Sequence, residues 1–544
     1  MIHQQNKDGG IVVYNWEDFF GLVPSYGFAN YNRMGKGASH QNAINVFRDL
    51  GILEPGFIST NFDSTTSNIA AQLNGGVVDR ASSQPNVWLI EKGAKIHQIA
   101  GSAGGVGSTI RTTVPFPFTI LSGTDSGGGG VDHSGHTTPV GEDIIIANID
   151  GTDYILYSYN DNTDGDVGQV PLAPAVATDF IENYFTRQAG IGNVLNKNYP
   201  HPMIQGDYSF YYIADGQKLK YIAPDGTTSV NSTIVPEGFA IKAFSKTGTH
   251  LILFCNKLKA STSTDSPRGE SIAVFWNYRS QRADFIKLLN DNKVVAGFNF
   301  QGIIGCFTVG RLNDFNNLSY TSKLQVFIDN EFKSVFNFSE VPSSYNCWDI
   351  HNNHLIWYAQ GTIFDFGKIA EEEEWKVNKI GSSIGRAEDA GMCKSLNGYS
   401  LFLSSGTGTS GGLEFYGTPS SGSPTFDPNA QWRGMVLEPL FPMGMKGKID
   451  MVEVGFFSTL STGKLKMDLL LDTDYGTQTT IIDDLDTITS GKQIVYKKLN
   501  SSGATLPDFN VLKPIINWVG GSAATDAPKV NYLKIYYSLI PIVI

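Results

Sequence analysis

Along the middle of the chain, short runs of alternating apolar and polar residues are interrupted by turn residues at a nearly constant interval. Runs such as DYSFYYI, THLILF and YSLFL have the two-residue period of β-strands. Between Gly151 and Gly398 the turns lie about 49 residues apart, which matches the roughly 40–50 residues of a β-propeller blade. The turn positions are Gly151, Gly206, Gly248, Gly302, Asn353 and Gly398.

The clearest repeat begins at Phe239 and contains four strand-like runs in about 50 residues, which is the composition of one blade. A second repeat follows it directly, with VVAGFNF, IIGCFTVG, KLQVFID and FKSVFNF. We therefore expect an all-β fold with a β-propeller over residues 71–426. Seven blades are favoured and six are the alternative, because the first blade lacks a readable opening hairpin.

The two ends of the chain differ from this repeat. Residues 1–70 are aromatic and Gly-rich with weak alternation, so we expect an extended N-terminal arm with a short helix near AINVFRDLG. The arm could close the ring by donating a strand. Residues 427–544 contain longer, strictly alternating strands, which predict a jelly-roll-like β-sandwich.

Composition narrows the range of partners. Charged residues make up only 17% of the chain, against roughly 25% in an average soluble domain, and the net charge is −12. This balance argues against sequence-specific nucleic acid binding, although DNA could still pass through a negatively charged channel. No secretory signal is visible, and no apolar run approaches the roughly 20 residues that span a bilayer, so we expect no membrane partner.

Four cysteines recur at the interval of the blades. Cys255, Cys306, Cys347 and Cys393 form no CxxC pair, so the spacing predicts buried thiols, one in each blade, rather than a zinc site or disulfides.

One loop resembles a calcium-binding loop. With Gly165 at the sixth position, Asn160, Asn162 and Asp164 occupy positions one, three and five, and Asp166 follows. The twelfth position is Pro171 rather than the expected Glu. Calcium is therefore the one candidate cofactor, and the alternative is an Asx-rich turn between two strands.

Two further clusters contain residue types that can bind metals or basic partners. Asp132, His133 and His136 lie in a Gly-rich insertion at 123–138, where we expect a solvated or partner-contacting loop. The acidic run Glu371–Glu374 predicts a solvated edge. A second insertion at 172–200 predicts a helix near 179–188. A P-loop and repeated Asp boxes are not present in the sequence.

The order of these parts suggests a resemblance. An opening arm with NWEDFFGLVPSYGFANYNRM, then propeller blades, then a sandwich ending in KVNYLKIYYSL resembles β-propeller virion structural proteins of tailed bacteriophages, from the tail, neck or nozzle. The resemblance implies a non-enzymatic protein that forms a homo-oligomeric ring with other virion proteins, is made in the bacterial cytoplasm and lets DNA pass. It transfers no functional residue.

Three functional hypotheses follow. The first is this virion structural role. The second is a receptor- or carbohydrate-binding tail protein (adhesin) that attaches to a glycan on the host surface, with aromatic side chains stacking on sugars. The third is a propeller glycosidase or lyase.

Overall fold

The computed structural model consists of antiparallel β-sheets, most of them built from strands that are consecutive in sequence. It describes residues 4–5, 11–17, 40–44, 46–49, 52–55, 60–61, 73–79, 86–91, 95–100, 118–119, 140–160, 165–172, 184–185, 194–259, 263, 265, 270–289, 293–314, 317–342, 344–351, 353–367, 376–381, 392–395, 401–407, 410–416, 426–427, 429–434, 441, 443–457, 466–474, 476–483, 493–520 and 527–542.

The chain divides into two compact units. The propeller unit comprises residues 61–361 and 386–415, and the sandwich unit comprises residues 1–60, 362–385 and 416–544. Each unit is described by itself below.

A series of small sheets confirms the β-propeller predicted from the turn interval. The sheets contain β7 (Leu73–Asp79), β8 (Asn86–Glu91), β9 (Lys95–Ala100) and β10 (Phe118–Thr119); β11 (Val140–Ile149), β12 (Thr152–Asn160) and β13 (Gly165–Pro171); β14 (Met203–Gln205), β15 (Tyr211–Asp215), β16 (Lys218–Ile222) and β17 (Thr228–Asn231); β18 (Phe239–Lys246), β19 (Leu251–Lys257), β20 (Ser271–Trp276) and β21 (Phe285–Leu289).

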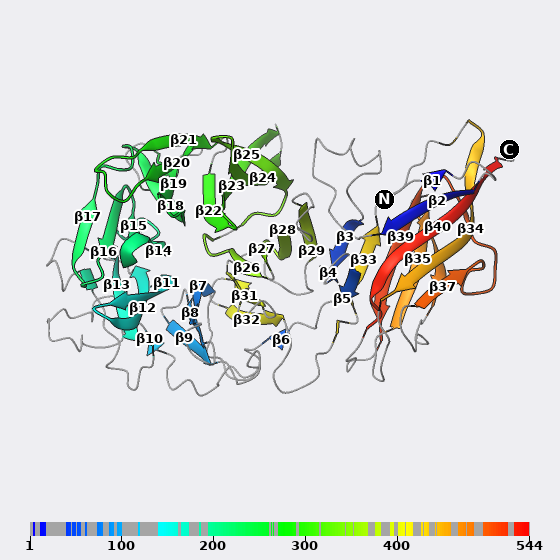
Figure 1. Ribbon diagram of the computed structural model, residues 1–544, viewed down its shortest axis with the longest axis horizontal. Helices are drawn as coiled ribbons and strands as arrows, with labels where there is room; N and C mark the ends of the chain where they lie inside the picture. Colours follow the sequence, from blue (N-terminus) through cyan, green and yellow to red (C-terminus); the bar gives the residue numbers. More distant parts are fainter. Residues whose placement is uncertain are drawn as a thin grey trace. The chain divides into compact units, whose positions relative to one another are not determined.

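The series continues with β22 (Lys293–Phe300), β23 (Ile303–Asp314), β24 (Asn317–Ile328) and β25 (Glu331–Phe338); β26 (Trp348–His351), β27 (His354–Ala359), β28 (Thr362–Gly367) and β29 (Lys376–Gly381); and β30 (Cys393–Ser395), β31 (Leu401–Thr407), β32 (Ser410–Tyr416) and β6 (Thr60–Asn61). In the propeller unit the first strands β11, β18 and β22 lie inside, and the last strands β17, β21 and β25 lie outside (Figure 1). The number of blades, seven or six, stays a prediction.

Central strands are buried on both faces, which explains their nearly continuous apolar sequence. In β15, Tyr212 and Ala214 pack against residues of β18–β20, whereas Tyr211 and Ile213 pack against residues of β11–β13. The side chains of strand β20 are divided in the same way between two cores, one shared with the preceding sheet and one shared with the following sheet. Each sheet therefore contributes alternate side chains to two cores, and the cores link successive sheets.

The predicted buried thiols are confirmed. None of the four cysteines forms a disulfide and all four are buried, and burial raises the pKa of the Cys347 thiol to about 12. At this pKa the thiol stays protonated and behaves as a small apolar group.

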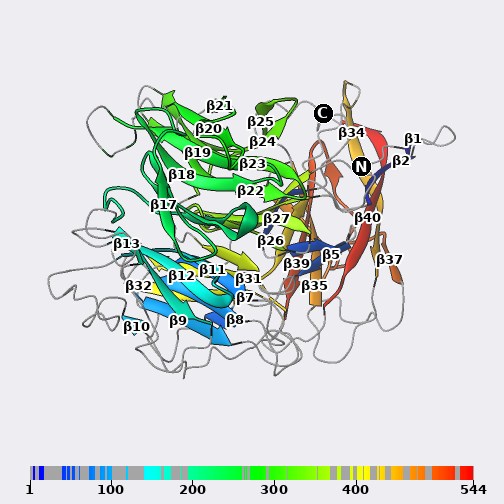
Figure 2. The same cartoon turned by 60° about the vertical axis from the view of Figure 1, so that its left-hand side comes forward.

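Two sheets form the sandwich unit, as the C-terminal alternation predicted. One contains β1 (Gln4–Gln5), β2 (Ile11–Glu17), β40 (Val530–Pro541), β34 (Met445–Phe456) and β37 (Gln493–Lys497), with β38 (Asp508–Phe509), β4 (Val46–Asp49) and β5 (Ile52–Pro55) attached. The other contains β3 (His40–Ile44), β33 (Gln431–Gly434), β39 (Leu512–Val519), β35 (Lys466–Thr473) and β36 (Thr477–Ile482). Figure 2 shows the two layers, with β35 and β39 in one and β34, β37 and β40 in the other.

Most of the described segments of the N-terminal arm form strands of these sheets. Strand β2 pairs with β40, and β3 pairs with β33. The helix expected near AINVFRDLG is wrong, because this segment contributes to β3 and β4: pairing of β3 with the distant β33 and of β4 with the neighbouring β5 outweighs its local helical pattern. The arm also supplies β6 to the sheet of β30–β32, which confirms the expectation of a donated strand.

In the second insertion, Tyr184 and Phe185 are helical, and the rest of the predicted helix at 179–188 lies outside the described residues. No helix in the described part of the chain is long and apolar enough to cross a membrane.

Candidate functional site

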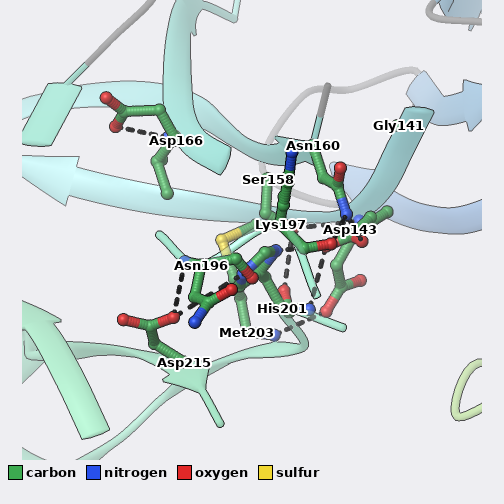
Figure 3. Close-up of polar contacts among 12 residues, drawn as sticks. Gly141, Asp143, Ser158, Asn160, Asp166, Asn196, Lys197, His201, Met203 and Asp215 are labelled. Carbon is green, nitrogen blue, oxygen red and sulfur yellow. Dashed lines mark hydrogen bonds and ion pairs between the residues drawn. The ribbon is translucent and has the colours of Figure 1, made fainter. Parts of the chain in front are cut away.

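Of the four candidate calcium ligands the structure describes Asn160 and Asp166, and it does not bring these two together. Asn162 and Asp164 lie outside the described residues, while Asn160 and Asp166 lie on the paired strands β12 and β13. Asp166 is opposite Tyr159 and Asn160 is opposite Gly165, so the side chains of Asn160 and Asp166 leave opposite faces of the hairpin. Figure 3 shows them well separated.

Each of these two side chains has other partners. The Asn160 amide donates to Glu142 Oε1 at 3.3 Å and to the Lys197 carbonyl at 2.8 Å. Asp166 accepts from the backbone amides of Val167 and Phe185. No group of three or more His, Cys, Asp or Glu side chains among the described residues could hold a metal ion.

The other clusters noted in the sequence fall outside the described residues. These are Asp132, His133 and His136 in one loop and Glu371–Glu374 in another. Of the tryptophans, Trp357, Trp432 and Trp518 are fully buried, which agrees with packing roles, whereas Trp276 lines a pocket.

A buried polar cluster joins the inner strands of the propeller unit (Figure 3). The Asp143 carboxylate on β11 accepts hydrogen bonds from the amides of Ile144 at 2.8 Å and Met203 at 2.7 Å, and from Asn346 Nδ2 at 3.1 Å. Burial raises its pKa to about 6, although these three hydrogen bonds act in the opposite direction. Asn346 is 203 residues from Asp143, so this carboxylate ties distant segments together.

The same cluster continues through His201, which is fully buried. Its Nδ1 lies 2.5 Å from Glu142 Oε2, and its Nε2 lies 3.9 Å from Asp215 Oδ1. Burial alone would lower the pKa of His201, but the two carboxylates raise it above its usual value. Asp215 also pairs with Lys220 at 3.3 Å, where burial lowers the pKa of the lysine. These groups satisfy one another inside the fold, and we assign them a structural role.

A pocket of about 590 Å³ opens between the sheets of β14–β17 and β18–β21. Its walls come from the turn before β15, from β15–β17 with the segment after β17, and from the end of β20 with the turn that follows. The pocket is lined by Asp207, Tyr208, Phe210, Tyr212, Tyr221, Val230, Asn231, Ser232, Thr233, Trp276, Tyr278, Arg279, Ser280 and Gln281.

Aromatic rings form most of the apolar lining. The Tyr212 ring lies 5.6 Å from Trp276, 5.9 Å from Tyr278 and 5.8 Å from Tyr221, measured between centroids. Tyr212 and Trp276 are almost fully buried and belong to the core between the two sheets. Tyr208, by contrast, is 69% exposed at the rim. The pocket therefore has a rigid aromatic floor and an accessible aromatic edge.

The backbone is strained where it lines this pocket. Tyr208, Ser209 and Tyr278 have left-handed φ values of 56°, 59° and 66°. Each such residue costs of order 1–3 kcal/mol, and such strain clusters at functional sites. The Tyr278 hydroxyl is also buried without a hydrogen-bond partner among the described residues. Gly206 permits the close approach, because a Cβ at this position would collide with the Tyr212 ring.

Two charged side chains line the pocket, Asp207 and Arg279. Arg279 Nη2 donates to the Tyr208 hydroxyl at 2.9 Å, which holds the exposed ring in place. Within the described part of the chain, no ion pair or hydrogen bond engages the Asp207 carboxylate. The pocket thus combines aromatic surface with one anionic acceptor, one cationic donor and several uncharged polar side chains, as ligand pockets generally do.

Sequence reasoning did not find this site. Asp207 and Arg279 are 72 positions apart, and the turns around them have no catalytic motif. The available signal was the density of aromatics in DYSFYYI together with the FWNYRS turn. Alternation places these residues in strands but does not show that the two segments face the same pocket.

Comparisons with known proteins concern the fold. No protein-family model and no curated protein matches the chain. Similar solved structures include an exo-β-1,3-galactanase from Phanerochaete chrysosporium bound to β-1,3-galactotriose, which is 9% identical, covers 88% of this chain and 100% of its own, and has a TM-score of 0.31. The Dos1 propeller is 8% identical over 68% of this chain and 96% of its own, with a TM-score of 0.34. Drosophila Semaphorin 1b, extracellular domains 1–2, is 8% identical over 69% and 88%, with a TM-score of 0.38.

These findings correct the leading functional expectation. The non-enzymatic virion role in a tail, neck or nozzle is wrong: the similar structures include propeller glycoside hydrolases, and nothing ties the chain to a phage particle. That expectation rested on the order of arm, propeller and sandwich, and one β-architecture serves many functions. With TM-scores below 0.5, the activities of these structures are not transferred to this chain.

Proposed function

We propose that this protein binds carbohydrate in the pocket between the sheets of β14–β17 and β18–β21. The observation that supports this most strongly is the lining: six aromatic side chains together with Asp207 and Arg279. Sugars have apolar C–H faces that pack on aromatic rings and hydroxyl edges that need both acceptors and donors. The exposed Tyr208 ring and the charged pair provide these three features in one pocket.

The lining supports binding rather than cleavage of the sugar. Most glycosidases use two carboxyl groups that flank the scissile bond, roughly 5–9.5 Å apart. Among the described lining residues, Asp207 is the one carboxylate. Release of reducing sugar by the purified protein would favour the glycosidase hypothesis instead.

A glycan array followed by titration calorimetry tests the proposal. Tyr208→Ala removes an exposed ring and should weaken binding roughly 2- to 12-fold, since aromatic contacts contribute about 0.5–1.5 kcal/mol beyond area burial. Leu288→Ala is the matched control, because Leu288 is 68% exposed in the same unit and does not line the pocket. An array without bound glycans, or equal affinities for the two variants, would refute the proposal.

A further inference from the structure

We infer that the ligand of this pocket is an uncharged sugar whose neighbouring hydroxyl groups are bound between Asp207 and Arg279. This inference rests on the proposed carbohydrate binding and adds the chemical class of the ligand.

The charges that line the pocket cancel. Asp207 and Arg279 are the two charged residues of the described lining, one of each sign. A uronic or sulfated sugar would bring a second negative charge toward Asp207, and a protonated amino sugar would bring a second positive charge toward Arg279. The charge balance therefore favours a ligand without net charge.

Both charged groups have capacity for a ligand. The Arg279 guanidinium has five N–H donors, and its described side-chain hydrogen bond, from Nη2 to the Tyr208 hydroxyl, uses one of them. The Asp207 carboxylate has no hydrogen bond within the described residues. A hydroxyl can donate to a carboxylate and accept from a guanidinium, so adjacent sugar hydroxyls satisfy both groups through charge-assisted hydrogen bonds.

The Asp207 carboxylate also acts electrostatically on two tyrosines of the aromatic floor. Burial raises the pKa values of the Tyr212 and Tyr278 hydroxyls, and the Asp207 carboxylate raises both of them further. Lys246 is also influenced by Asp207, which opposes the lowering of its pKa by burial, but its Nζ is held by the Gln205 carbonyl at 2.7 Å. An anionic sugar on this floor would therefore meet an unfavourable potential.

Several other polar atoms around the pocket are already engaged. Trp276 Nε1 donates to the Ser280 carbonyl at 2.7 Å, and Thr233 Oγ1 donates to the Gln281 carbonyl at 2.5 Å. Asn231 Oδ1 accepts from the Thr233 amide at 3.0 Å. These bonds fix the walls, and Asp207 and Arg279 are the charged groups of the described lining.

The test uses trisaccharides of glucose, galactose and mannose, their uronic acid counterparts and their amino-sugar counterparts. Titration calorimetry with the full-length protein at low and high NaCl gives the affinities. We expect a neutral trisaccharide to bind at least about tenfold more tightly than its charged counterparts at low salt, with an affinity that salt hardly changes.

Asp207→Asn tests the carboxylate directly. This variant should bind the neutral sugar about tenfold more weakly, because a charge-assisted hydrogen bond becomes a neutral one, and it should lose most of its discrimination against the uronic acid. Glu237→Gln is the control, because Glu237 is exposed in the same unit and outside the pocket lining. It should match the wild type in both respects.

The outcomes separate this inference from the proposed function. Tightest binding of a uronic acid or amino sugar, or equal binding of all three classes, would overturn the neutral class while leaving carbohydrate binding intact. An unchanged preference in Asp207→Asn would overturn the role of the carboxylate. A folded protein that binds no trisaccharide and no arrayed glycan would refute both proposals.

Discussion

Replacement of Gly206 by alanine should destabilise the propeller unit by distorting the aromatic floor of the pocket. A Cβ at this position would lie 2.8 Å from Tyr212 Cδ2, closer still to Cε2, and 3.0 Å from Tyr278 Cε1. Tyr212 cannot simply move aside, because it is 3% exposed and its ring packs against Trp276 and Tyr221 at centroid distances of 5.6 and 5.8 Å.

The expected cost follows from this crowding. Adding a methyl group to a well-packed core costs about 1–3 kcal/mol. For a unit of this size, that corresponds to a fall in Tm of roughly 2–8 °C. Gly248→Ala is the same chemical change at a position with no atom within 4 Å, so its unfolding free energy should stay within about 0.5 kcal/mol of the wild-type value.

Urea unfolding, followed by tryptophan fluorescence, measures the difference. Trp276 packs against Tyr212, so the folded-state fluorescence of Gly206→Ala should also change, while that of Gly248→Ala should not. Equal midpoints and slopes for the two variants would show that the Tyr212 ring is free to relax, and the description of a rigid floor would then be wrong.

Two further predictions concern the polar cluster and the calcium loop. Burial raises the pKa of Asp143 from 3.8 to about 6, so its contribution to stability is complete below pH 4 and is lost as the pH rises through about 6. The unfolding free energy of the wild type should therefore fall by about 3 kcal/mol more over this range than that of Asp143→Asn, and parallel pH profiles would contradict the shift. In the calcium loop, the side chains of Asn160 and Asp166 leave opposite faces of their hairpin. Adding EGTA and then calcium should therefore leave the Tm unchanged in thermal melts. A rise in Tm with calcium would contradict this and favour a calcium site that includes Asn162 and Asp164.

Much of the fold could be predicted from local sequence. The alternation in β35 (KMDLLLDT) buries Met467, Leu469 and Leu471 on one face, and the apolar run of β19 is buried on both. Such patterns are local because a strand has a fixed two-residue period. The arm was less predictable, since the strand that begins the AINVFRDLG segment pairs with β33 far along the chain, where Ala43 lies opposite Trp432.

The sequence by itself determined an all-β chain, the turn interval of the propeller, the alternating sandwich strands and the burial of the four cysteines, because each depends on near neighbours in the chain. Only the tertiary structure decided the pocket. It places Asp207 and Tyr208 beside Tyr278 and Arg279, which come from the adjacent sheet, and it separates Asn160 from Asp166 although they are six residues apart. The physical reason is that a ligand site depends on which side chains meet across sheets, and the packing of the folded chain decides this rather than the local period.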